Sequence, residues 1–247
     1  MECASSCNNR ILVAGAGGVI GRRLCPLLIG DGWSVTGTTR STEKMPLLRD
    51  IGVEPVLVDV FDEQALIDIV RQVQPDIVIH QLTDLPPGLD PMKMAEARIR
   101  NAHLREIGTR NLVAAAVASG VKRLIAQSIA FAYAPGLMPY SEDSPLNLTD
   151  EGAGLTARAV ASLEKQVLDA PLEGIVLRYG KLYGPGTGFT EPPAGGALHV
   201  DAAADAARRA ITRGGAGIYN VAEEDGSVCS RKAMDVLGWN SDFRTAR

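Results

Sequence analysis

The stretch Ile11-Leu12-Val13-Ala14-Gly15-Ala16-Gly17-Gly18-Val19-Ile20-Gly21 joins a short apolar run to the start of a helical pattern. The apolar run predicts a buried strand over Ile11–Ala14, and the pattern that follows predicts a helix over Ile20–Ile29. Gly15 permits a tight turn, Gly18 leaves room for a pyrophosphate to approach backbone N–H groups, and Gly21 lets the helix pack closely on the strand. The positive end of the dipole of this helix also faces the pyrophosphate. The stretch therefore predicts a dinucleotide-binding turn, to which Gly17, Val19 and Ile20 also belong.

The rest of the chain repeats this alternation of strand and helix. Further strands are predicted over Ser34–Thr39, Glu54–Val58, Asp76–His80, Leu124–Ser128 and Ile175–Arg178. Helices are predicted over Glu43–Asp50, Asp62–Val73, about Pro91 to Ser119, and about Leu155 to Leu168. The strands are apolar almost throughout, which is typical of a parallel sheet covered on both faces. We therefore expect an α/β fold, a Rossmann-type doubly wound parallel sheet with helices on both faces.

The C-terminal part departs from this regularity. The glycine- and proline-rich segment Gly184–Gly196 is predicted to be a loop and a candidate mobile lid. It is followed by a helix near Asp201–Thr212, a strand near Ile218–Val221 and a helix near Ser230–Leu237. This is too little chain for a second domain. We expect one NAD(P)-binding domain over residues 1–247, in which residues 180–247 form a small cap at the carboxyl edge of the sheet.

Composition narrows the possible partners and the compartment. The 247 residues are 46% hydrophobic and 22% charged with a net charge of -4, and their basic residues form no stripe that would favour nucleic acid or an anionic membrane. No apolar stretch approaches the roughly 20 residues of a membrane-spanning helix, and the polar N-terminus resembles no signal peptide, so we expect a cytoplasmic protein. The three histidines and four cysteines lack the spacing of a metal site or a disulfide framework. No metal is predicted.

The end of the second strand indicates which dinucleotide is preferred. An Asp or Glu at this place usually binds the ribose hydroxyls of NAD(H), but this strand ends in Thr38-Thr39-Arg40-Ser41. Arg40 can pair with the 2′-phosphate of NADP(H), and Ser41 can add a hydroxyl. The sequence favours NADP(H) over NAD(H); the alternative is that Arg40 is a solvated surface residue.

Several motifs, in order along the chain, resemble those of the extended short-chain dehydrogenase/reductase family, the NAD-dependent epimerase/dehydratase group. They are the GxxGxxG turn, Asp59-Val60, Gln81-Leu82-Thr83, the segment Leu177-Arg178-Tyr179-Gly180-Lys181-Leu182-Tyr183-Gly184-Pro185-Gly186-Thr187, and His199-Val200-Asp201. The resemblance implies that Asp59 and Val60 contact the adenine and that Gln81, Leu82 and Thr83 line the nicotinamide ribose. It also implies that Tyr179 lies beside the nicotinamide.

The family's proton relay, a Tyr and a Lys four residues apart on one helix, has no counterpart in this sequence. Aligning the helix on Ala161–Leu168 places Thr156 at the tyrosine position and Val160 at the lysine position. Shifting the alignment to use Lys165 as the lysine puts Ala161 at the tyrosine position, so neither alignment gives the pair. The usual catalytic hydroxyl at the end of the fifth strand falls on Ile129, and Ser128 is the nearest hydroxyl. A threonine hydroxyl is far less acidic than a phenol, so the standard relay is absent.

Two hypotheses follow. In the first, the chain is an NADP(H)-dependent oxidoreductase or isomerase acting on a small organic molecule, with Ser128, Tyr133 and Lys181 as candidate catalytic residues and Tyr140 and Tyr183 as further candidates. Each of these residues also has an ordinary structural role available. In the second hypothesis, the chain binds NADP(H) and serves as a redox sensor without turnover. The helix over Pro91–Ser119 either pairs with its counterpart in a homodimer, as the resemblance implies, or covers the sheet.

Overall fold

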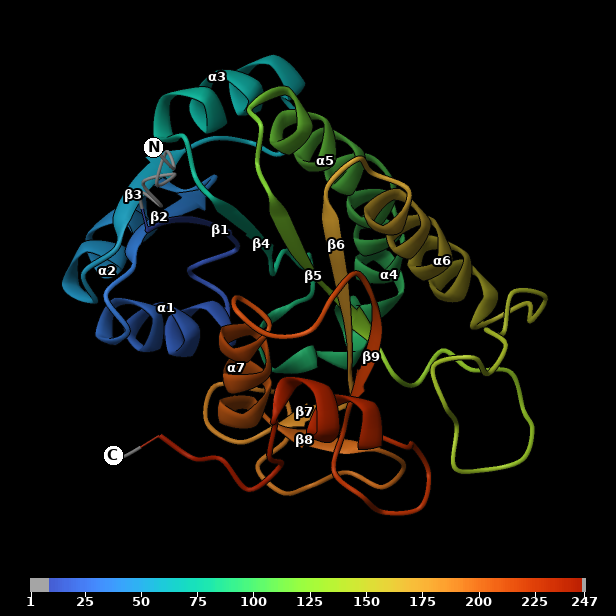
Figure 1. Ribbon diagram of the computed structural model, residues 1–247. Coiled ribbons are helices and arrows are strands. Elements are labelled where there is room, and N and C mark those ends of the chain that lie inside the picture. Colours follow the sequence, from blue (N-terminus) through green and yellow to red (C-terminus); the bar gives the residue numbers. More distant parts are fainter. Residues whose placement is uncertain (1–8, 246–247) are drawn as a thin grey trace.

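The computed structural model describes residues 9–245, which form a seven-stranded sheet with the strand order β3-β2-β1-β4-β5-β6-β9 (Figure 1). All six pairings between neighbouring strands are parallel. The strands are β1 (Arg10–Ala14), β2 (Ser34–Thr39), β3 (Glu54–Leu57), β4 (Ile77–His80), β5 (Arg123–Ile129), β6 (Glu173–Tyr179) and β9 (Gly217–Val221). The doubly wound α/β fold predicted from the sequence is confirmed.

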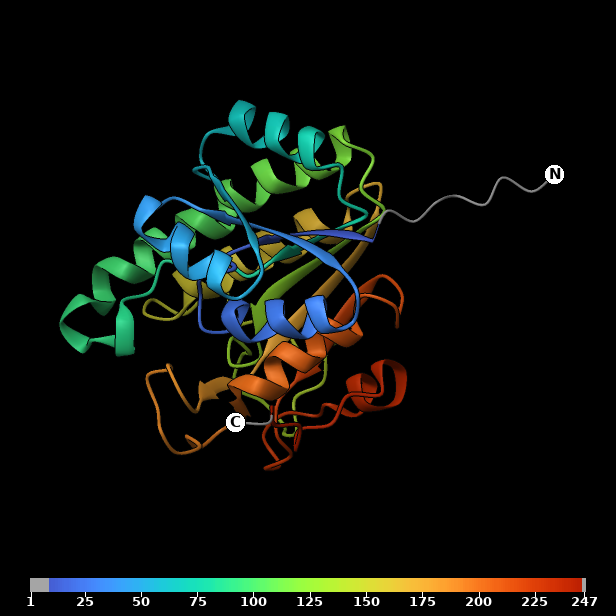
Figure 2. The ribbon, with the colours of Figure 1, turned by 90° about the vertical axis from the view of Figure 1, so that its left-hand side faces the viewer.

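Helices cover both faces of the sheet (Figures 1 and 2). Side chains alternate along β1, so that Ile11 and Val13 pack on one face, and Leu12 and Ala14 pack on the other. The first face is covered by α1 (Gly21–Gly30), α2 (Met45–Asp50) and α7 (Val200–Arg209). The second face is covered by α3 (Glu63–Val73), α4 (Met94–His103), α5 (Thr109–Ala118) and α6 (Gly154–Leu168).

The helix predicted over Pro91–Ser119 contains a change of winding. It starts with a 3-10 turn over Pro91–Lys93, and α4 and α5 are joined without a break by a π-helical turn over Leu104–Gly108. Such turns are frequent at functional sites. This one places the side chain of Leu104 in a pocket and buries Arg105.

Other helix ends follow the sequence signals. Asp62 caps α3 as predicted, because its carboxylate accepts a hydrogen bond from the N–H of Ala65 at 3.0 Å. The helix predicted over Glu43–Asp50 starts instead as a 3-10 turn over Thr42–Lys44 and continues as α2.

Residues 180–245 contribute to the central fold as well as to its edge. β9 pairs with β6 in the main sheet, and α7 packs beside α1. At the carboxyl edge, β7 (Lys181–Tyr183) and β8 (Ala197–His199) form a separate two-stranded parallel sheet that the sequence pattern had not predicted, because three residues are too few to show a period. A final π-helical turn covers Ala233–Leu237.

Within residues 9–245, no helix is long and apolar enough to cross a membrane. The same residues contain no group of three His, Cys, Asp or Glu side chains that could hold a metal ion. Cys25 and Cys229 are free thiols, whereas Cys3 and Cys7 lie outside the described residues.

Gly21 and Gly30 are the first and last residues of α1, and comparing them tests how closely the start of this helix packs on the glycine turn. A methyl group on Gly21 would overlap the carbonyl oxygens of Gly15 and Ala16, whereas one on Gly30 would meet no atom within 4 Å. We expect Gly21→Ala to destabilise the protein by about 1–3 kcal/mol through overpacking. Gly30→Ala should be neutral or stabilising by up to about 1 kcal/mol. Urea denaturation measures both, and equal effects of the two substitutions would contradict this account.

Candidate dinucleotide site

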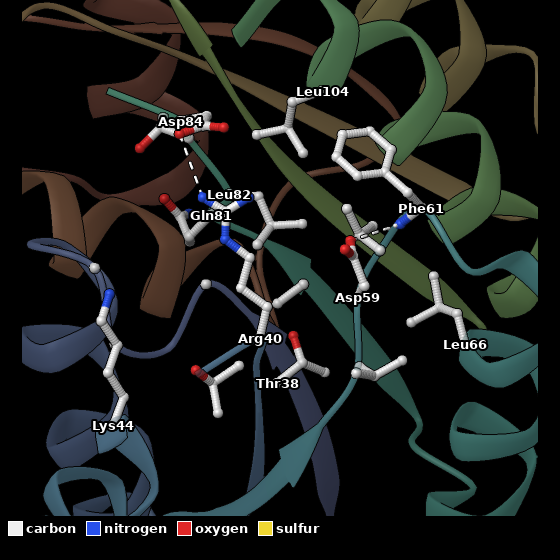
Figure 3. A pocket seen from close by; sticks show the side chains of 18 residues that line it. Thr38, Arg40, Lys44, Asp59, Phe61, Leu66, Gln81, Leu82, Asp84 and Leu104 are labelled. Atoms are coloured by element: carbon white, nitrogen blue, oxygen red, sulfur yellow. Dashed lines mark hydrogen bonds and ion pairs between the residues drawn. The ribbon is translucent and has the colours of Figure 1, made fainter. Parts of the chain in front are cut away.

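A pocket lies at the carboxyl ends of β1, β2, β3 and β4 (Figure 3). This is the point at which the strand order reverses around β1, and open α/β sheets bind ligands there. Nine residues predicted to bind the cofactor line it: Gly15, Gly17, Gly18, Arg40, Asp59, Val60, Gln81, Leu82 and Thr83. The remaining lining residues are Ala14, Thr38, Thr39, Lys44, Val58, Phe61, Leu66, Asp84 and Leu104.

The glycine turn forms one wall of the pocket. Gly15 has a φ of 92°, and a Cβ there would lie 2.6 Å from the carbonyl oxygen of Gln81. The N–H of Gly18 donates to the carbonyl oxygen of Gly15 at 3.0 Å, which closes the turn. α1 follows directly, and no side chain caps its N-terminus at Ile20. The N–H groups of Arg22 and Arg23 donate to the carbonyl oxygens of Gly18 and Ile20, whereas that of Gly21, the first residue of α1, has no backbone acceptor within residues 9–245 and is available to an anion such as a pyrophosphate.

The other predicted residues of this turn lie around the pocket without lining it. Ile20 and Gly21 are buried beneath the turn. Val19 faces a second hollow, whose other lining residues are Arg22, Arg23, Pro185 and Gly186. Arg23 links α1 to α7 and to the loop after β7 beside this hollow. Its guanidinium pairs with Asp201 at 2.7 Å and donates to the carbonyl oxygen of Pro185 at 3.0 Å.

The segment after β3 forms an apolar wall. The carboxylate of Asp59 accepts from the N–H of Phe61 at 3.0 Å, and the amide of Asn111 donates to the carbonyl oxygen of Val60 at 3.0 Å. Phe61 stacks on His103 with ring centroids 5.0 Å apart. These contacts hold the segment in place, so that Phe61, Leu66 and Leu104 offer a surface suited to a flat ring. Sequence reasoning missed these three residues, although Phe61 directly follows the predicted pair Asp59-Val60.

Two cations border the pocket. Arg40 reaches from the end of β2 to Asp84, where its guanidinium lies 3.3 Å from the carboxylate (Figure 3). Lys44 lies at the pocket beside Gly17, since the 3-10 turn after β2 folds it back. Ser41 is half-buried and does not line the pocket, and its N–H donates to the hydroxyl of Thr39 at 3.1 Å. Sequence reasoning missed Lys44 and Asp84, for which the only signal was their closeness to Arg40 and Thr83.

The end of β4 is fixed by buried groups. The side-chain N–H of Gln81 donates to the hydroxyl of Tyr179 at 3.3 Å, and the Oε1 atom of Gln81 is buried without a partner among residues 9–245. Tyr179 itself is buried outside the pocket lining, and burial raises its pKa. His80 accepts from the N–H of Leu82 at 3.2 Å and contacts the hydroxyl of Thr109 at 2.9 Å. Burial, assisted by a nearby arginine, lowers the pKa of His80 to about 4, so the imidazole is neutral and can hold Leu82 in this way.

The candidate catalytic hydroxyls lie in a different, buried network. Ser128 donates to Glu164 at 2.7 Å, and Arg178 binds both oxygens of Glu164 at 2.8 and 2.7 Å. Arg178 also donates to the hydroxyl of Tyr133 at 3.0 Å, and that hydroxyl donates to Asn220 at 2.5 Å. Ser128, Arg178 and Asn220 are paired across β5, β6 and β9, so they point to the same face of the sheet, toward α6.

These contacts occupy the hydroxyls that sequence reasoning had singled out. Burial raises the pKa of Tyr133, even though Arg178 acts in the opposite direction. Burial alone would lower the pKa of Arg178, but the hydrogen bonds and charge of Glu164 raise it. Neither Ser128 nor Tyr133 lines the pocket.

The other candidates are also engaged in the part of the chain that the structure describes. The ammonium group of Lys181 donates to the carbonyl oxygen of Ala194 at 2.7 Å, which ties β7 to the Gly184–Gly196 loop. Tyr183 donates to Glu223 at 2.8 Å, and Tyr140 stacks on Tyr133 with centroids 5.0 Å apart. The structure therefore brings nine of the fourteen predicted cofactor residues to one pocket and brings none of the catalytic candidates there.

A family model described as the NAD dependent epimerase/dehydratase family matches residues 11–195. The chain belongs to this family, as its motifs predicted. Among characterised proteins, it is similar to "3-diazoavenalumate denitrifying reductase" of a Streptomyces species, with 40% identity over 238 residues, 87% of this chain and 76% of the relative. It is also similar to "2-alkyl-3-oxoalkanoate reductase" of Stenotrophomonas maltophilia, with 31% identity over 190 residues. That match spans 72% of this chain but only about half (52%) of the relative.

Solved structures show the same fold. A UDP-glucose 4-epimerase from Thermotoga maritima, solved with UDP-glucose, superimposes with a TM-score of 0.77 at 19% identity, covering 95% of this chain and 94% of that one. A UDP-glucose 4-epimerase from Thermus thermophilus, solved with NAD, superimposes with a TM-score of 0.68 at 22% identity, covering 96% of this chain and 86% of that one.

The buried network around Glu164 and Arg178 predicts that removing one of these two charges greatly lowers the stability of the protein. Glu164→Ala leaves the guanidinium of Arg178 buried without its counter-ion, and we expect it to destabilise the protein by about 3–5 kcal/mol. The matched control is Lys165→Ala, which breaks a solvent-exposed pair with Asp169 and should have a far smaller effect on stability. Urea denaturation compares the two, and a similar small effect of both would show that the network is not structural.

Proposed function

We propose that the protein is an NADP(H)-dependent reductase of a small organic molecule. The observation that carries this proposal is the pair of cations, Arg40 and Lys44, that line the pocket after β2, whose end, Thr38-Thr39-Arg40-Ser41, contains no Asp or Glu. A guanidinium and an ammonium group attract a 2′-phosphate, whereas a carboxylate at the end of β2 would favour the free ribose hydroxyls of NAD(H). When bound, this cofactor would supply a hydride.

The rest of the pocket supports a bound dinucleotide. The glycine turn presents Gly15, Gly17 and Gly18, which carry no side chains, to the pocket, and α1 begins there without a side-chain cap. The apolar wall of Phe61, Leu66 and Leu104 suits an adenine ring. The partnerless Oε1 atom of Gln81 is a buried acceptor that needs a donor, and a ribose hydroxyl would provide one.

Arg40→Asp tests the cofactor preference. The substitution should weaken NADPH binding by about 1–3 kcal/mol, because a charge-assisted hydrogen bond to the 2′-phosphate is replaced by repulsion, and it should affect NADH much less. Isothermal titration calorimetry measures both affinities. Arg71→Asp is the control, since it makes the same change of charge at an exposed position of α3 outside the pocket. An equal loss for NADPH and NADH would contradict a role of Arg40 in the preference.

The substrate class is constrained by the missing proton relay. Reduction of a carbonyl group needs a hydride and also a proton on oxygen, which the family's tyrosine and lysine would supply. Here Thr156, Val160 and Ile129 stand at the relay positions. Replacement of the diazonium group of an organic molecule by hydrogen needs only a hydride, R–N₂⁺ + H⁻ → R–H + N₂. This reaction takes up no proton. The relative with 40% identity is named a denitrifying reductase of a diazo compound. We therefore propose a small organic carboxylate bearing a diazo group, in its diazonium form, as the substrate class.

This substrate class is tested with purified protein, NADPH and a diazonium-bearing aromatic carboxylate. We expect loss of NADPH absorbance together with an equal amount of nitrogen gas, above the rate without protein, and little turnover of simple ketones, aldehydes or enones. Reduction of ketones without attack on the diazonium compound would contradict the proposed substrate class. Tight NADPH binding without turnover of any of them would favour a redox sensor instead, the second function that the missing relay suggests.

A further inference from the structure

We propose that Asp84 is a specificity-determining residue of the dinucleotide pocket, because it competes with the 2′-phosphate of NADP(H) for the guanidinium of Arg40. This inference rests on the proposed function. Asp84 is not part of the motifs by which the cofactor site was predicted. It directly follows Gln81-Leu82-Thr83 at the end of β4 and lines the pocket.

The ion pair spans the pocket from one strand end to another. Arg40 follows β2, and Asp84 lies four residues after the end of β4. Since the strand order is β2-β1-β4, a side chain that joins these ends passes over the end of β1, where the glycine turn lies. Figure 3 shows Arg40 extended toward Asp84, with Lys44 on one side and Asp59 and Phe61 on the other. The Arg40 guanidinium is thus directed to the rim of β4 instead of lying free at the end of β2.

Asp84 is the fixed partner of this pair. Its N–H donates to the side-chain oxygen of Asn101 at 2.9 Å, and Asn101 is buried. Its carboxylate lies 3.5 Å from the guanidinium of Arg100, a second cation on the same anion. The side chain of Asp84 is only 20% exposed, whereas that of Arg40 is 62% exposed. Arg40 is therefore the partner that has room to leave.

The charges of Arg40, Asp84 and the 2′-phosphate determine which dinucleotide binds more weakly because of Asp84. A 2′-phosphate offers Arg40 a stronger, charge-assisted contact than a single carboxylate oxygen at 3.3 Å does. NADP(H) gains this contact only after the pair with Asp84 is broken, and its phosphate is also repelled by the Asp84 carboxylate. NAD(H) carries no such phosphate, so Arg40 can stay on Asp84 while it binds. Asp84 should therefore weaken NADP(H) binding selectively.

Asp84→Asn tests this inference, since it removes the charge and keeps the shape. We expect the dissociation constant of NADPH to fall about two- to fivefold, the size of effect typical of a partly exposed ion pair, and that of NADH to stay unchanged. In an Arg40→Ala background, Asp84→Asn should give a clearly smaller gain, because Arg40 no longer links the two residues. Isothermal titration calorimetry of the full chain measures the affinities of the unmodified protein, the two single variants and the double variant for both dinucleotides.

Glu96→Gln is the matched control. Glu96 pairs with the same Arg100 at 3.8 Å but does not line the pocket, so its loss should change neither affinity. If Asp84→Asn strengthened NADPH and NADH binding equally, the inference would be overturned, because the Arg40–Asp84 pair would then hinder any dinucleotide. Weaker NADH binding would also overturn it, since Asp84 would then bind a ribose hydroxyl itself. Failure of the unmodified protein to bind NADPH would instead refute the proposed function.

Discussion

The close approach of Gly15 to the carbonyl group of Gln81 is the constraint on which the site depends. A side chain at position 15 would lie 2.6 Å from that oxygen, so the turn after β1 packs directly on the end of β4 only because Gly15 has none. This contact brings the N-terminus of α1 and the residues after β4 to the same pocket. The neutral imidazole of His80 fixes the residues after β4, because it accepts a hydrogen bond from the N–H of Leu82.

The buried ion pair between Glu164 and Arg178 organises the opposite half of the sheet. It links α6 to β6, and through Ser128, Tyr133 and Asn220 it reaches β5 and β9. A buried pair of this kind is costly to disrupt but is satisfied here by several hydrogen bonds. Glu164 ties α6 to β6, and on the same helix Val160 is fully buried and Thr156 is half-buried.

The sequence predicted the sheet and half of the residues that line the pocket, nine of eighteen, because both rest on local patterns. Apolar runs mark the strands of a parallel sheet, and a glycine turn between strand and helix has one geometry. The residues that it missed depend on contacts between distant segments. Lys44 reaches the pocket only through a 3-10 turn, Leu104 through a π-helical turn, and Asp84 meets Arg40 across 44 positions. Likewise, Ser128 and Tyr133 were candidate catalytic hydroxyls in the sequence, and only the fold shows that Glu164 and Arg178 lie beside them.

The protonation of the buried groups bears on the chemistry that the pocket can support. Burial keeps His80 neutral near neutral pH by lowering its pKa, and it keeps the Tyr179 phenol protonated by raising its pKa. Neither group is poised to exchange a proton, and the Tyr133 phenol is held protonated in the same way. A general acid works best when its pKa lies near the working pH. None of these three groups lines the pocket, so none is placed to deliver a proton there. The substrate class proposed above, in which the departure of dinitrogen balances the hydride, would need no such proton.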